Sequence, residues 1–144
     1  MDKIIYSQLC DDSFDYNILE SVRANAYGFK SVSEYYYNLL CEKKLMVFIA
    51  GINQNIIGGC FVSNAQHALY VEQLFILSTF QNNGIGGNLL NYVLANKEEV
   101  ENTFNQEVDF AKIAPANLNS ERLYRRLGFR TPTNSLTGSM IKRI

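Results

Sequence analysis

The sequence is poor in the residues that interrupt or cross-link a fold. It holds only two prolines and nine glycines in 144 residues, so long structureless stretches are not expected. Its longest apolar run, residues 45–52, is far shorter than the about 20 residues that a membrane-spanning helix requires. The first residues also lack the charged-then-apolar pattern of a secretory signal. The sequence therefore predicts a protein with no membrane segment and no membrane partner.

Cysteine is the second scarce residue type. The three cysteines, Cys10, Cys41 and Cys60, are an odd number and lie far apart in the chain. No two of them have the spacing of metal ligands, and no set of disulfides accounts for all three. The cysteine pattern predicts a reduced, cytoplasmic protein without a metal site.

Excess charge of either sign is also missing. Thirteen Lys and Arg residues oppose 14 Asp and Glu residues, which gives a formal charge of −1. A general nucleic-acid binder usually carries a strong basic surface, so no nucleic-acid partner is expected. With 47% hydrophobic and 19% charged residues, the length predicts one folded domain over residues 1–144.

Hydrophobic periodicity predicts a mixed α/β fold. Helices are expected over Phe14–Ala26, Ser31–Cys41, a stretch that begins near Ile85, and Asn119–Leu127. Strands are expected over Lys3–Tyr6, Leu45–Ile52, Ile56–Val62, Ala68–Leu77, Glu107–Ile113 and within Leu136–Ile144. The order β-α-α-β-β-β-α-β-α-β places antiparallel strands first and crossover units later. It predicts a mixed, mostly antiparallel sheet flanked by helices.

A glycine-rich loop, residues 81–87, connects the strand ending at Leu77 to the next helix. Gly84, Gly86 and Gly87 would let an anion approach the backbone, and the helix N-terminus supplies unpaired N–H groups. The loop lacks the Gly-Lys-Ser/Thr of a Walker A motif and the third glycine of a dinucleotide fingerprint. A phosphate site and a simple strand-to-helix turn both remain open at this point.

A second group of polar residues precedes the C-terminal strand. Ser120 and Tyr124 are four residues apart on one expected helix, so they share a face, and Asn117 lies just before that helix. Tyr124 could donate a proton to a leaving group. The alternative is a half-buried tyrosine that packs against the sheet.

Taken together, the two groups resemble the GNAT N-acetyltransferase superfamily. Gln81-x-x-Gly84-x-Gly86 is similar to that family's Arg/Gln-x-x-Gly-x-Gly/Ala motif. The second motif, usually Asn-x-x-Ala/Ser-x-x-x-Tyr-x-x-x-Gly-Phe, is matched from Asn117 to Phe129. The order of elements from Lys3 onwards also agrees with the family's fold.

The resemblance implies that acetyl-CoA is the co-substrate. Its pantetheine arm would run along strand residues Leu74, Phe75 and Ile76. The family's loop binds the pyrophosphate, and the corresponding residues here are Gln81, Asn82, Asn83, Gly84, Ile85, Gly86 and Gly87.

The second motif would complete the donor site. The resemblance implies that Asn117 and Ser120 bind the cofactor and that Tyr124 protonates the departing thiolate. Asn82 and Asn83 stand where the family often has basic residues, which lowers the charge of the loop. Arginines of the last helix, at positions 122, 125 and 126, could compensate or could form a solvated helix face.

Glu72 is the candidate base. It lies nine residues before Gln81, on a strand similar to that of spermidine/spermine-type acetyltransferases, where a glutamate at this position acts as base. Strand alternation predicts that Tyr70, Glu72 and Leu74 share one face and that Gln73 is on the other. The alternative is a paired or solvated carboxylate. His67 in a turn and Cys60 on a strand are weaker catalytic candidates.

These features predict an acetyl-CoA-dependent N-acetyltransferase that acts on the primary amine of a small molecule. The amine would attack the thioester directly in a ternary complex. Phe29 and Tyr35–Tyr37 lie where the family often builds its acceptor pocket. Two alternatives remain: a protein or peptide amine as acceptor, and a non-catalytic acyl-CoA sensor. Family members often pair, which suggests a homodimer.

Overall fold

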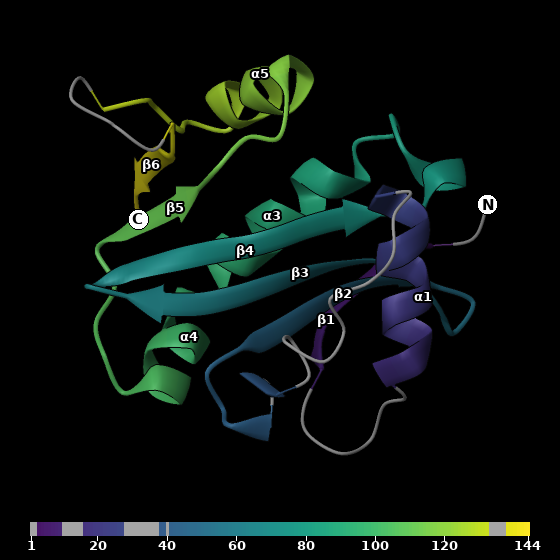
Figure 1. Ribbon diagram of the computed structural model, residues 1–144, viewed down its shortest axis with the longest axis horizontal. Helices are drawn as coiled ribbons and strands as arrows, with labels where there is room; N and C mark the ends of the chain where they lie inside the picture. The colour runs from purple at the N-terminus through teal and green to yellow at the C-terminus, as the bar shows by residue number, and fades with distance from the viewer. Residues whose placement is uncertain (1–2, 10–15, 28–37, 40, 133–137) are drawn as a thin grey trace.

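The computed structural model describes residues 3–9, 16–27, 38–39, 41–132 and 138–144 (Figure 1). One sheet of six strands forms the centre, in the order β1-β2-β3-β4-β5-β6. The strands are β1 (Ile5–Leu9), β2 (Met46–Ile52), β3 (Asn55–Ala65), β4 (Ala68–Ile76), β5 (Phe110–Ile113) and β6 (Met140–Arg143). All neighbouring strands are antiparallel except β4 and β5, which are parallel. The predicted mixed, mostly antiparallel fold is confirmed.

Helices pack on both faces of this sheet. They are α1 (Tyr16–Tyr27), α3 (Ile85–Ala95), α4 (Lys97–Phe104) and α5 (Leu118–Arg126), with a short 3₁₀ turn, η2 (Ser78–Phe80), after β4. In the described part of the chain, none of the helices has both the length and the hydropathy to cross a bilayer. The helix predicted over residues 31–41 falls largely outside the described residues, as does the start of the last predicted strand.

Two-residue turns hold the antiparallel strands in register. Asn53 and Gln54 between β2 and β3, and Gln66 and His67 between β3 and β4, all have positive φ angles of 49° to 67°. Turns with two positive φ angles match the right-handed twist of the strands that they join. The β2–β3 hairpin was predicted from its polar turn cluster.

Helix α4 was not predicted. Val100 is its one fully buried residue, so its apolar stripe is too thin to show a clear period. Asn96 separates it from α3: its side-chain amide donates to the Tyr92 carbonyl at 2.7 Å, and its backbone N–H caps the same helix end.

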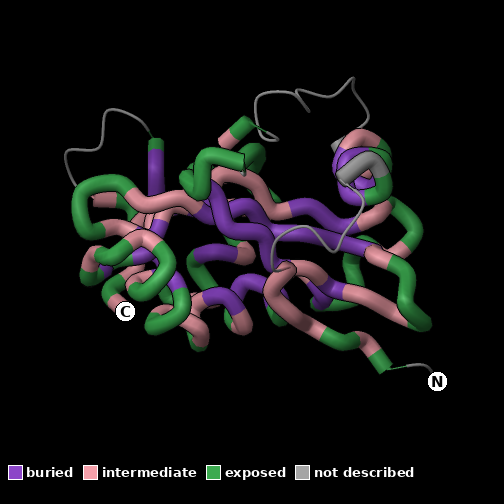
Figure 2. The backbone as a smooth tube through the Cα atoms, turned by 90° about the horizontal axis from the view of Figure 1, so that it is seen from below, coloured by how far each residue is buried: buried purple, intermediate pink, exposed green. Residues whose placement is uncertain are grey.

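Two apolar clusters fill the two faces of the sheet. The larger lies between the sheet and α3 and includes Phe48, Leu89 and Leu90. The smaller lies under α1 and includes Leu19 and Phe61. Figure 2 shows that the buried residues gather in the middle of the molecule.

Strand β4 carries a β-bulge at Glu72. Val71 pairs with Val62 and Gln73 pairs with Phe61. Phe61 and Val62 are consecutive in β3, so Glu72 is an extra residue in β4 that has no partner in the register. The parallel ladder to β5 ends at Val71, and β4 continues to Ile76 beyond it. From this point β5 and α5 lead away from β4 (Figure 1).

The bulge reverses the alternation of side chains along β4. Val71 and Leu74 pack into the same cluster, although alternation would put them on opposite faces. Glu72 bonds to Ser63, which lies two residues from Phe61 of the α1-side cluster. Glu72 and Leu74 are therefore on opposite faces, and the prediction that they share one was wrong.

Candidate active site

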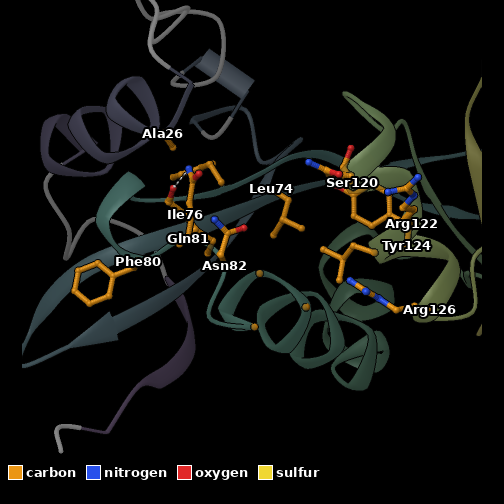
Figure 3. Close-up of a pocket in the computed structure, with 16 residues that line it drawn as sticks. Ala26, Leu74, Ile76, Phe80, Gln81, Asn82, Ser120, Arg122, Tyr124 and Arg126 are labelled. Atoms are coloured by element: carbon orange, nitrogen blue, oxygen red, sulfur yellow. Dashed lines mark hydrogen bonds between the residues drawn. The ribbon is translucent and has the colours of Figure 1, made fainter.

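A cavity of about 670 Å³ opens where β4 and β5 part. The end of β4, the glycine-rich loop, the first turn of α3 and one face of α5 form its walls, and Ala26 of α1 reaches its edge (Figure 3). Leu74 belongs to the α3-side cluster and Phe75 to the α1-side cluster, and both line the cavity. The cavity is therefore bounded by residues from both faces of the sheet.

Most residues proposed from the sequence meet in this cavity. Four do not line it: Glu72, Asn83, Ile85 and Asn117. Those that do are Leu74, Phe75, Ile76, Gln81, Asn82, Gly84, Gly86, Gly87, Ser120 and Tyr124.

Gly84 and Gly86 of the loop border open space, so neighbouring atoms do not force these positions to be glycine. Gly84 has a φ of +78°, which only glycine adopts readily, and a Cβ added there would meet no atom within 4 Å. A Cβ on Gly86 would meet only Ile76 Cγ1, at an ordinary 3.6 Å. By contrast, a Cβ on Gly58 or Gly59 of β3 would come within 2.5 Å of a side-chain atom. Packing thus requires the glycines of β3, whereas the fold does not require the one at 86.

Two side chains of the loop stabilise the loop itself. The Gln81 amide donates to the Ile76 carbonyl at 2.9 Å. The Asn83 amide donates to the carbonyls of Phe80 and Gln81 at 3.3 and 3.2 Å. Ile85 is buried in the core. These residues hold the shape of the turn. The first internal hydrogen bond of α3 runs from the Asn88 N–H to the Gly84 carbonyl, so the backbone N–H groups before Asn88 in the first turn have no acceptor within the helix.

A capping box fixes the start of α5. The Asn117 side-chain oxygen accepts from the Ser120 N–H at 2.9 Å, and the Ser120 hydroxyl oxygen accepts from the Asn117 N–H at 3.0 Å. Asn117 thus uses its side-chain oxygen within the helix cap. Tyr124 follows Ser120 one turn later, and both residues line the cavity.

Tyr124 is both packed and on the cavity wall. It is 7% exposed, and its ring contacts that of Phe129 at a centroid distance of 6.1 Å. Gly128 follows the helix with a φ of +100°, a conformation typical of the glycine that ends a helix. The Lys142 ammonium donates to the Leu127 carbonyl at 2.7 Å and so holds this end of the helix on the sheet. The hydroxyl-bearing ring is therefore held firmly at the cavity.

Glu72 lies in a polar cluster on the α1 side of the sheet. The Ser63 hydroxyl donates to its carboxylate at 2.7 Å. The adjacent Gln73 side chain accepts from Arg23 of α1 at 3.1 Å, and the buried Arg23 guanidinium also donates to Glu20 at 2.9 Å. Gln73 thus faces α1, contrary to the face predicted for it relative to Glu72. Arg23 and Glu20 gave no signal in the sequence, because α1 and β4 are about 50 positions apart.

The weaker catalytic candidates have ordinary surroundings. Cys60 is fully buried, and burial raises the pKa of its thiol well above the usual range, which keeps it protonated. His67 is exposed in the turn that begins β4, at the opposite end of the strand from the loop. Phe29 and Tyr35–Tyr37 lie outside the described residues.

The arginines of α5 divide into two kinds. Arg122 and Arg126 line the cavity. Arg125 instead donates to Glu121 at 2.9 Å and to Thr131 at 3.0 Å. Leu123, between the first two on the same side, packs near Gly87 and was missed by the sequence reasoning.

Comparisons with known proteins agree with this geometry. The acetyltransferase (GNAT) family model matches residues 13–129. A search of curated protein sequences finds no match. Similar solved structures include the ribosomal-protein-S18-alanine N-acetyltransferase of Escherichia coli, at 17% identity and a TM-score of 0.77, covering 99% of this chain and 94% of that one.

Two further similar structures contain acetyl-CoA. One is a GNAT family acetyltransferase from Elizabethkingia anophelis, at 19% identity and a TM-score of 0.69, covering 98% of each chain. The other is a GNAT family acetyltransferase from Brucella melitensis, at 16% identity and a TM-score of 0.74, covering 99% of this chain and 88% of that one. Because the family model matches most of the sequence, this chain belongs to the acetyltransferase (GNAT) family and is an N-acetyltransferase.

Proposed function

We propose that the protein transfers the acetyl group of acetyl-CoA to the primary amine of a small molecule, by direct attack in a ternary complex. The observation that carries this proposal is the cavity that brings the glycine loop and Tyr124 together at the point where β4 and β5 part. Two structures similar in fold contain acetyl-CoA, which supports the choice of donor.

The donor half of the cavity fits a CoA thioester. The N–H groups at the start of α3, with the positive end of the helix dipole, suit the diphosphate. The open space at Gly84 and Gly86 allows its close approach. The pantetheine arm then follows β4 at Leu74–Ile76, where β5 no longer accompanies that strand. Among the functional residues, Asn117 acts by fixing α5, and Ser120 both caps α5 and lines the cavity.

In this mechanism the amine nitrogen attacks the thioester carbonyl carbon. The C–N bond forms, the C–S bond breaks, and the acetylated amine and CoA result. A free alkylamine has a pKa of about 10.4, as lysine does, so it must lose a proton before attack. Glu72 would take that proton through a water molecule, because its carboxylate does not line the cavity. Tyr124 would protonate the departing thiolate.

Direct attack is favoured over an acyl-enzyme intermediate. A covalent route needs a nucleophile at the cavity. Cys60 is buried as a neutral thiol in the core, and the Ser120 hydroxyl on the cavity wall donates to the Asn117 carbonyl at 2.9 Å within the helix cap. Positioning of the two substrates in one cavity supplies the rate gain instead.

The acceptor is expected on the α1 side, where Ala26 edges the cavity. In the sequence, aromatic residues at Phe29 and Tyr35–Tyr37 follow soon after Ala26, which favours a small apolar or cationic amine. The second candidate is a protein amine, since one similar structure is a ribosomal-protein-S18-alanine N-acetyltransferase. The homodimer and the cytoplasmic setting stay predictions.

A direct comparison of acceptors tests this proposal. Purified protein is given acetyl-CoA with a panel of diamines and aralkylamines, or with peptides that present a free N-terminal amine, and kcat/KM is measured from released CoA thiol. The proposal expects at least one small amine to be the better substrate. Turnover of peptides alone would favour the protein acceptor. Binding of CoA without turnover of any amine would indicate an acyl-CoA sensor.

A further inference from the structure

A charged network lies between α1 and β4, and none of its three residues lines the cavity. Arg23 of α1 is fully buried, and its guanidinium donates to the Glu20 carboxylate at 2.9 Å and to the Gln73 side-chain oxygen of β4 at 3.1 Å. Arg23 Nε also donates to the two Glu20 oxygens, at 3.2 and 3.1 Å. The network therefore joins one turn of the helix to one residue of the strand.

Apolar packing already holds α1 on the sheet without this network. Leu19 and Val22 of α1 belong to one buried cluster with Phe61 of β3. Taking an ion pair out of water has a cost that apolar side chains of similar size would avoid, so the network is a weak source of stability. A hydrogen bond is directional, however, and fixes a helix against a strand more narrowly than apolar contacts do. The network is therefore better explained by position than by stability.

On β4, the bond reaches the strand at its bulge. Gln73 directly follows the bulge residue Glu72, and both side chains lie on the α1 side of the sheet. From there alternation resumes, so that Leu74 packs on the α3 side and Phe75 on the α1 side. By holding the Gln73 side chain on the α1 side, Arg23 stabilises the orientation that the rest of β4 follows into the cavity.

On α1, the bond lies one turn before the cavity. Ala26 is three residues after Arg23, so the two side chains lie on the same face of the helix. Ala26 lies at the edge of the cavity (Figure 3). It packs against the cluster that contains Phe75, which lines the cavity from β4. The separation of α1 and β4 therefore sets the width of the cavity at this end, where the acceptor is expected.

We propose that Arg23 is a positioning residue for the acceptor amine. Through Gln73 it fixes α1 against β4, and so it keeps the end of the cavity between Ala26 and Phe75 at the width that the amine requires. The inference rests on the proposed function, because it concerns acceptor binding in the same site. The glycine loop and α5, which form the donor end, take no part in the network.

Steady-state kinetics with the best acceptor of the amine panel, at saturating acetyl-CoA, tests this role. Gln73→Met keeps the length of the side chain and removes the oxygen to which Arg23 donates. Arg23→Lys keeps the charge beside Glu20 but replaces the planar fork of donors with a single ammonium group.

Both substitutions should change acceptor binding and leave the donor and the chemical step nearly intact. We expect each to raise the KM of the acceptor at least about fivefold, the lower end of typical coupling between linked sites, with the calorimetric Kd of acetyl-CoA changed less than about twofold. Glu72 keeps its bond to Ser63, so kcat should also change little. If Arg23→Lys does not fold, Gln73→Met decides alone, because it changes no charge.

A double-variant cycle and a control on the other face of the sheet separate positioning from loss of stability. If the two residues act through one bond, Arg23→Lys/Gln73→Met should raise the KM no further than the larger single effect. Val100→Ala leaves a gap under α4, on the α3 side of the sheet, and should lower the Tm without changing the KM of the acceptor. Thermal melting of each protein supplies the comparison.

Three results would overturn this inference and leave the proposed function standing. They are a wild-type acceptor KM in the folded single variants, effects that multiply in the double variant, and a rise in KM for Val100→Ala as large as theirs. If the folded wild type binds acetyl-CoA and acetylates no amine, the proposed function and this inference both fail.

Discussion

Replacing Gly86 with alanine should leave the fold at least as stable as the wild type and yet weaken acetyl-CoA binding. The added Cβ would contact Ile76 Cγ1 at 3.6 Å, an ordinary van der Waals distance. Alanine in a helix is more stable than glycine by about 0.5–1 kcal/mol, because glycine loses more backbone freedom on folding. For a chain of this size, that corresponds to a rise in Tm of about 1–4 °C.

The binding effect has the opposite sign because the same Cβ enters space that the ligand needs. Gly86 lines the cavity in the first turn of α3, where the phosphate would approach the backbone. We expect the Kd of acetyl-CoA to rise at least about tenfold, equivalent to about 1.4 kcal/mol. Gly86→Asp adds a negative charge to the steric block and should abolish measurable binding.

Two controls isolate this effect. Gly59→Ala puts a Cβ about 2.5 Å from the Phe75 ring, so it should lower the free energy of unfolding by about 1–3 kcal/mol through overpacking. Asn91→Asp introduces the same negative charge as Gly86→Asp, but at an exposed position of α3 that does not line the cavity. It should leave the Kd of acetyl-CoA unchanged. Thermal melting and calorimetric titration give both quantities. A folded Gly86→Asp protein with wild-type affinity would refute the assignment of the loop.

The remaining predictions concern three side chains. Tyr124→Phe keeps the packed ring and removes the hydroxyl, so turnover should fall about 10²–10⁴-fold with little change in the Kd of acetyl-CoA; wild-type turnover would mean that the tyrosine only packs. Glu72→Gln should lose turnover most near neutral pH and recover in part as pH rises, because the fraction of neutral amine then grows; a wild-type pH–rate profile measured with saturating acceptor would remove Glu72 from the mechanism. Burial raises the pKa of Cys60, so the folded state keeps its thiol proton after the unfolded chain has lost it, and the stability of the protein should fall as pH rises above about 9. Chemical denaturation from pH 7 to 10 measures the free energy of unfolding, which should fall less with pH for Cys60→Ala than for the wild type. An equal fall in the two proteins would contradict this explanation.

Local patterns made much of the fold and site predictable from the sequence. The loop from Gln81 to Gly87 and the helix with Ser120 and Tyr124 each occupy one short segment, and short-range rules cover caps, turns and glycines. The hairpin between β2 and β3 follows from its polar turn in the same way. These parts agree with the structure because their conformation depends on neighbours within a few positions.

The features that were missed depend on contacts between distant segments. The bulge at Glu72 is a property of the register between β3 and β4, and it reverses the face of every later residue of β4. Arg23 reaches Gln73 across 50 positions, so its buried environment has no local signature. Which arginines of α5 face the cavity depends on how this helix packs against α3, where Leu123 lies near Gly87. Periodicity alone cannot supply these relations.

Amine-dependent release of CoA thiol is the measurement that tests the central claim most directly. Wild-type protein, Tyr124→Phe and Gly86→Asp are each given acetyl-CoA with and without the best amine of the panel, and the acetylated product is counted by mass spectrometry. The account predicts one acetylated amine for each thiol released by the wild type, a large loss in Tyr124→Phe, and none in Gly86→Asp at acetyl-CoA concentrations that saturate the wild type. Thiol release that does not depend on an amine, or equal product formation by all three proteins, would contradict it.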